Sequence, residues 1–151
     1  MKQKILKKSL ETIVEICEDG ITGYETAAET INDDDLKTQF LRIVQQRKGF
    51  VEELKNEAYR LGIELDDMGT AKGFFHRTWL TAKATISTDT NEKVIEESMK
   101  GEKYAVDTYH EVMKGEKLPI YLEETLEKQQ SLIKAAILQL EGLKIEAIKE
   151  S

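Results

Sequence analysis

The chain has 151 residues and a mass of 17.3 kDa, the size of one domain with one hydrophobic core, so we expect a single domain over 1–151. With 40% hydrophobic and 34% charged residues and one proline, the composition favours long helices and excludes a disordered or all-β chain. The formal charge of -7 argues against nucleic acid and membrane partners, and a lone Cys17 without a signal-peptide or membrane-spanning run predicts a cytoplasmic protein.

The first half of the chain predicts two antiparallel helices. Residues 2–30 carry apolar or small residues at alternating spacings of four and three, which is the heptad pattern of a bundle helix: Leu6, Leu10, Ile13, Cys17, Gly20, Tyr24, Ala27 and Ile31. The acidic run 32–35 ends this helix and caps the next, because carboxylates are favoured at helix N-termini. The second helix spans residues 34–61 and ends at Gly62.

The connection after Gly62 is too long for a hairpin turn and predicts a crossover. A shorter helix is expected over residues 70–87, where aromatic and apolar residues keep helical spacing: Phe75, Trp79, Ala82 and Ile86. A connection of this length can travel the length of a bundle. The second and third long helices are therefore expected to run parallel, as in ferritin-like folds.

The second half predicts two more long helices. The third opens at Asp89, with Glu92 in capping-box spacing, and ends near Gly115. The fourth begins at Pro119, a residue favoured at the first helical position, and continues to about Lys149. The sequence therefore predicts an all-α four-helix bundle.

Each long helix carries one non-hydrophobic interruption of its apolar seam, near its middle: Gly20 flanked by Asp19, Arg47, Glu102, and Gln130, or Gln129 if the register differs by one residue. Mid-helix positions of an antiparallel bundle meet at one level, so these residues are expected to form a core polar layer. Arg47 and Glu102 are expected to form a buried pair in the space that the glycine leaves. Tyr24 and Tyr109 lie one step away and can add hydroxyls. The layer either fixes helix register or forms a metal or ligand site.

A carboxylate-bridged di-metal centre needs Glu-x-x-His motifs, and the chain has only two histidines, His76 and His110. His110 follows Asp107 by three residues, but both lie off the seam and are expected at the surface. If a metal such as iron or manganese is held, the residual ligand set is Glu102, Asp19, Glu127 and Gln130.

The segment Lys100-Gly101-Glu102-Lys103-Tyr104 resembles the third helix of rubrerythrin-type ferritin-like proteins, in which such a stretch carries a metal-ligand glutamate. Over roughly residues 8–140 the chain resembles a family of bacterial ferritin-like four-helix-bundle proteins of unknown function. The motifs that carry this wider resemblance are Asp19-Gly20, Gly23-Tyr24, Ala27-Ala28-Glu29, Arg47 with Phe50, Glu53-Leu54, Leu61-Gly62 and His76-Arg77 with Trp79.

The resemblance implies a ferritin-like fold, with relatives often described as stress-associated. It places Glu102 at the ligand glutamate of the third helix and Gln130 near the ligand position of the fourth. The chain departs from the pattern on two helices. The second has Arg47 and Phe50 in place of Glu-x-x-His, and the fourth has Glu127-Lys128-Gln129-Gln130. A cation at a ligand position repels a metal and can neutralise Glu102.

We therefore expect a non-catalytic bundle without a cofactor, in a stress-associated or housekeeping role, which acts through its surface, as a homo-oligomer or with a protein partner. The alternative is a metal-binding redox or storage protein that uses the residual carboxylates. A third hypothesis is a ligand- or partner-binding bundle whose contact surface is the aromatic crossover around Phe74 and Trp79.

Overall fold

The computed structural model describes residues 2–66, 91–115 and 117–150, and these residues form four long α-helices. Their bounds are α1 Lys2–Thr30, α2 Asp34–Arg60, α4 Asn91–Gly115 and α5 Ile120–Glu150. The all-α four-helix prediction is confirmed. The shorter helix predicted over residues 70–87, together with Phe74, His76 and Trp79, lies outside the described residues.

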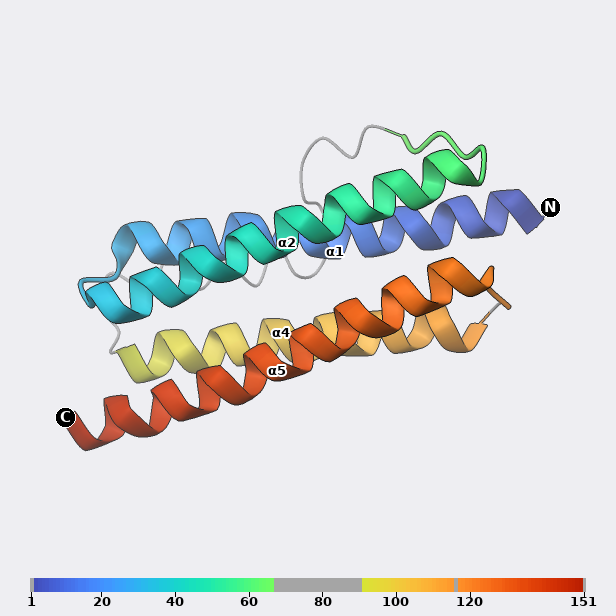
Figure 1. Cartoon of the computed structure of the whole chain (residues 1–151). Coiled ribbons are helices and arrows are strands. Elements are labelled where there is room, and N and C mark those ends of the chain that lie inside the picture. The colour runs from blue at the N-terminus through green and yellow to red at the C-terminus, as the bar shows by residue number, and fades with distance from the viewer. Residues whose placement is uncertain (1, 67–90, 116, 151) are drawn as a thin grey trace.

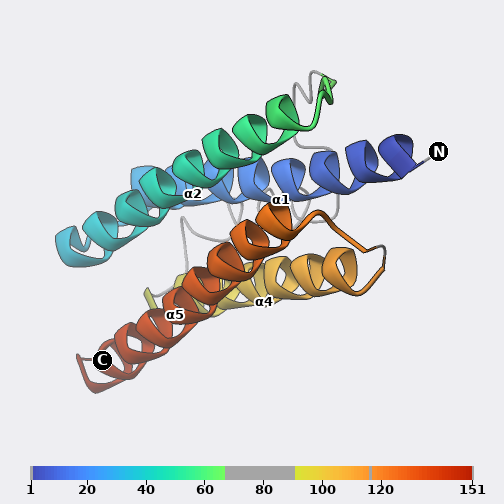
Figure 2. The same ribbon diagram turned by 45° about the vertical axis from the view of Figure 1, so that its right-hand side comes forward.

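The four helices form two antiparallel pairs that pack against each other (Figure 1). α1 lies beside α2 and α4 beside α5, while α1 also contacts α4 and α2 contacts α5. Figure 2 shows the same two pairs from a second direction. α2 and α4 are diagonally opposite and run in the same direction, so the end of α2 and the start of α4 lie at opposite ends of the bundle (Figure 1).

The ends of the first two helices follow from specific residues. Asp33 caps α2, and its carboxylate Oδ1 accepts a hydrogen bond of 3.0 Å from the Leu36 backbone N–H. Gly62 has a φ of +70°, the left-handed conformation that glycine adopts without steric cost. Its N–H and that of Ile63 donate to carbonyls of the last turn of α2, which is the Schellman pattern. The predicted cap and stop are both confirmed.

The third long helix ends at Gly115 as predicted, and the start of the fourth differs from the prediction by one residue. The described part of α4 begins at Asn91, and the predicted start at Asp89 lies outside the described residues. α5 begins at Ile120, one residue after Pro119, whose carbonyl accepts from the Glu123 N–H at 3.0 Å. Pro119 therefore holds the N-cap position rather than the first helical position.

The core follows the seams that the heptads predict. Fully buried side chains come from all four helices, and the largest hydrophobic ones are Tyr24, Tyr109, Phe40, Leu10, Ile13, Leu54, Ile95, Leu122, Leu126 and Ile133. Arg47 lies among them as the largest fully buried side chain of the described residues. No helix in the described ranges is both long and apolar enough to cross a membrane.

Candidate functional site

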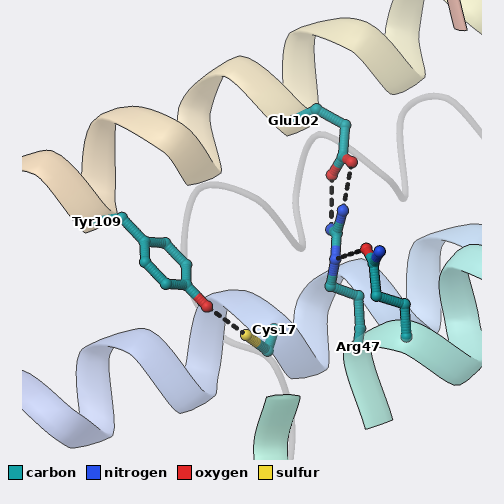
Figure 3. Close-up of polar contacts among 5 residues, drawn as sticks. Cys17, Arg47, Glu102 and Tyr109 are labelled. Atoms are coloured by element: carbon teal, nitrogen blue, oxygen red, sulfur yellow. Dashed lines mark hydrogen bonds and ion pairs between the residues drawn. The ribbon is translucent and has the colours of Figure 1, made fainter. Parts of the chain in front are cut away.

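The centre of the bundle holds an ion pair between Arg47 of α2 and Glu102 of α4 (Figure 3). Arg47 Nη1 donates to Glu102 Oε1 at 2.7 Å, and Arg47 Nη2 donates to Glu102 Oε2 at 2.5 Å. The two residues are 2% and 0% exposed. Because α2 and α4 are diagonally opposite, this pair spans the axis of the bundle. The buried pair predicted from the seams is confirmed.

Further groups hold the Arg47 side chain in place. Its Nε donates to Gln46 Oε1 at 3.3 Å, and its Cζ lies 5.7 Å from the centroid of the Phe50 ring. Burial alone would lower the pKa of Arg47, but the adjacent charge of Glu102 outweighs it and raises the pKa. Arg47 therefore remains a cation in the core.

Tyr24 of α1 lies beside this pair. Its ring packs against Phe40 with centroids 5.3 Å apart, and the residue is fully buried. Burial raises the pKa of Tyr24, and the negative charge of Glu102 raises it further. The Tyr24 hydroxyl thus stays neutral beside the charged pair.

A second polar cluster lies next to the ion pair and centres on Tyr109 of α4. The Tyr109 hydroxyl donates to Gln129 Oε1 at 2.7 Å. It also lies 3.3 Å from Cys17 Sγ of α1 (Figure 3). Gln129 Nε2 in turn donates to the Phe50 carbonyl at 3.3 Å and to Glu53 Oε1 at 3.2 Å. The seams indicated the Tyr109 hydroxyl, but the Cys17 and Glu53 contacts were not predicted. The only sequence signal for the Cys17 contact was that Cys17 lies on the same apolar seam as Tyr24.

Burial dominates the acid–base properties of this cluster. It raises the pKa of the Cys17 thiol to about 11, although the hydrogen bond with Tyr109 acts in the opposite direction. It likewise raises the pKa of Tyr109, and the neighbouring Cys17 adds to the shift. Cys17 is therefore a protonated core residue and not a thiolate nucleophile.

The layer uses Gln129 where the prediction favoured Gln130 and kept Gln129 as the alternative. Gln129 is fully buried, whereas Gln130 is half-buried and donates to the Val106 carbonyl at 3.1 Å. Leu126 and Ile133 are seven residues apart, and a seam can pass between them at either position. The contact with Tyr109 decides in favour of Gln129.

Asp19 and Gly20 are both buried in α1, but Asp19 does not join the ion pair. Within the described ranges nothing gives Asp19 Oδ1 a hydrogen bond, and the side chain makes no salt bridge to Arg47. Burial raises the pKa of Asp19 to about 7, and the charges of Glu15 and Glu18 on the same helix contribute.

The residues present do not fit a carboxylate-bridged di-metal centre. Both carboxylate oxygens of Glu102 already accept hydrogen bonds from a guanidinium, which places a positive charge where a metal would bind. Glu127, Asp107 and His110 are exposed, as expected for the last two. Across residues 2–66, 91–115 and 117–150, no three His, Cys, Asp or Glu side chains are grouped to hold a metal ion.

Two surface grooves lie away from the layer. One of about 660 Å³ runs between α1 and α2 near Val14 and Ile63, and one of about 510 Å³ runs between α1 and α4 near Ile5 and Tyr104. Neither is lined by Arg47 or by another residue of the layer. The polar layer thus belongs to the packed interior of the bundle.

The fold and the layer together define the class of protein: a four-helix bundle in which a buried ion pair joins two helices across the centre. The chain belongs to the family described as Domain of unknown function (DUF2383), whose model matches residues 6–115. The match includes Arg47 and Glu102 and ends with α4, so α5 lies beyond it. No curated protein matches the chain.

Proposed function

We propose that this protein is a non-catalytic, ferritin-like bundle in which the Arg47–Glu102 pair occupies the place of a di-metal centre. The observation that carries the proposal is the bidentate contact, which uses both oxygens of Glu102. The common direction of α2 and α4 supports the ferritin-like assignment, because a long crossover between these helices is typical of that fold. The resemblance to stress-associated bundles favours a role in the stress response through the protein surface.

The chemistry of the pair supports a structural role. A metal at Glu102 would have to displace a guanidinium that makes two short hydrogen bonds in a buried, low-dielectric site. Removing Arg47 from the carboxylate would leave a buried cation without its partner, which costs about 3–5 kcal/mol. Metal binding would have to offset that cost before any net affinity appeared.

The test is the metal content of the full chain, produced in medium supplemented with iron, manganese and zinc, and measured by elemental mass spectrometry. We expect less than about one metal in ten chains, and no oxygen consumption on addition of ferrous iron. One tightly held metal per chain would overturn the proposal. If metal is found, its loss in Glu102→Gln but not in Glu123→Gln, which changes an exposed carboxylate of α5, would assign it to the layer, and so to the metal-binding alternative.

A further inference from the structure

The outer face of α5 carries a second apolar seam. Its core-facing seam includes Ile133, Ala136 and Leu140, all of which are buried. A second set follows each of these by two positions, about 200° further round the helix, and continues by one heptad step: Ala135, Leu138, Gly142 and Ile145. We call these four residues the outer seam. α5 is therefore apolar on two opposite faces.

The outer seam is open to solvent. Leu138 is 74% exposed and Ile145 is 48% exposed, while Ala135 and Gly142 are also exposed. A Cβ added at Gly142 would meet no atom within 4 Å, so no residue of the described ranges covers this part of the helix. The spacings of three, four and three are those of a coiled-coil seam, and small and large side chains alternate along it. Scattered surface hydrophobic residues do not show this periodicity.

We propose that the outer seam packs against the outer seam of a second copy of this chain, with the two α5 helices antiparallel. This dimer interface deepens the proposed function, in which the protein acts through its surface. The biological role of the dimer rests on that function, but its formation does not. The family match ends at residue 115, so the surface lies outside the part of the chain that defines the family. In this packing Leu138 of one copy can enter the space that the small Ala135 of the other copy leaves.

The charges beside the seam indicate the second copy and its direction. Lys134 and Glu141 are both exposed and each directly precedes a small seam residue, so they share one edge of the helix. In antiparallel packing, equivalent edges of the two copies face each other. A two-fold axis near Leu138 then places Lys134 of each copy beside Glu141 of the other, which gives two attractive pairs.

Parallel packing would have the opposite effect. There each edge faces the other edge of the partner helix, and Glu141 of one copy would lie beside Glu146 of the other. Two neighbouring carboxylates repel each other. The sequence of α5 therefore favours antiparallel self-association and disfavours the parallel arrangement.

The first experiment is sedimentation equilibrium of the full chain. We expect a dimer, and we expect Leu138→Lys to weaken dimerisation at least tenfold while circular dichroism shows an unchanged helix content. Leu41→Lys is the matched control, because Leu41 is 44% exposed on α2 and lies outside the seam. Lys134→Glu should weaken the dimer, and the charge swap with Glu141→Lys should restore it. A monomeric wild type, or a dimer that Leu138→Lys leaves unchanged, would overturn the proposal.

Disulfide cross-linking tests the direction of the helices. Leu138→Cys lies near the proposed axis and should cross-link on mild oxidation. Ile145→Cys should not, because its two copies would be about 20 Å apart along the helices at 1.5 Å per residue. The native Cys17 is buried, so the wild-type chain gives the background level of cross-linking. Equal cross-linking at both sites would indicate parallel packing and overturn the proposal. Metal content measured on the Leu138→Lys variant tests the proposed function separately, because the layer lies inside each bundle.

Discussion

Replacing Glu102 by glutamine tests the ion pair directly. The variant keeps the shape of the side chain but removes the charge that accepts two hydrogen bonds, of 2.7 and 2.5 Å, from Arg47. The guanidinium is then a buried cation without a counter-charge, at 2% exposure. Breaking a buried pair in this way costs about 3–5 kcal/mol, and we expect a loss of about 3 kcal/mol in the free energy of unfolding. For a chain of this size, that loss lowers the melting temperature by roughly 6–12 °C.

Urea unfolding followed by circular dichroism at 222 nm measures this loss. The matched control is Glu97→Gln, which breaks a surface pair on the same helix. Its partner Lys100 is 70% exposed, and the Nζ to Oε1 distance is 3.2 Å. Such pairs contribute at most about 1 kcal/mol, so the control should unfold near the wild-type midpoint. If Glu102→Gln also unfolded there, the burial of the charge in this layer would be refuted.

The double variant Arg47→Met with Glu102→Leu separates the cost of an orphaned charge from the value of the pair. Replacing both partners by apolar side chains removes the charge and its counter-charge together. Buried pairs exchanged in this way are often neutral or more stable by about 1–4 kcal/mol. We therefore expect the double variant to recover most of the stability that Glu102→Gln loses. A double variant as unstable as the single one would show that packing volume, rather than charge, determines the loss.

Three further results are expected. Tyr109→Phe leaves Gln129 Oε1 without its donor and should lower stability by about 1–3 kcal/mol, whereas Tyr121→Phe, which changes a 70% exposed side chain, should change it little. Cys17, buried and with a pKa of about 11, should resist alkylation in the native protein up to pH 9 and react readily in urea. Asp19 has a folded pKa of about 7 against an ordinary 3.8, so its contribution to stability falls as pH rises between these values. The stability gained by Asp19→Asn should accordingly grow from pH 4 to pH 7 in urea titrations.

The sequence predicted the four long helices well because their signals are local. The heptad spacing of α1 fixed both its extent and its buried face, and Asp33 and Gly62 marked helix ends through capping and backbone chemistry that act within a few residues. Arg47 and Glu102 could be paired from the sequence because they interrupt two apolar seams at the same level. A buried charge needs a partner of opposite charge, and these two residues can neutralise each other.

The finer arrangement of the layer could not be predicted, because it depends on how each helix is rotated about its own axis. A turn of α5 by about 100° about its axis exchanges Gln129 for Gln130, and the seam pattern allows both. The Cys17 thiol contacts the Tyr109 hydroxyl because of how far α1 and α4 are shifted along the bundle axis relative to each other. Asp19 was predicted to join the layer because it precedes Gly20, and it is buried, yet it makes no salt bridge to Arg47. These contacts follow from packing across helices and have no sequence period.

We propose that the ion pair also selects one helix arrangement. Apolar seams on four helices can pack in several neighbour orders at similar free energy, because leucine and isoleucine contacts have little directionality. The guanidinium of Arg47 and the carboxylate of Glu102 are stabilised only where α2 and α4 lie across the axis from each other with their centres level. Any other order or a one-turn slip leaves two charges buried without partners, at a cost of several kcal/mol. On this proposal, the pair disfavours other helix arrangements more than it adds to the stability of the observed one, as expected of a polar layer that specifies register.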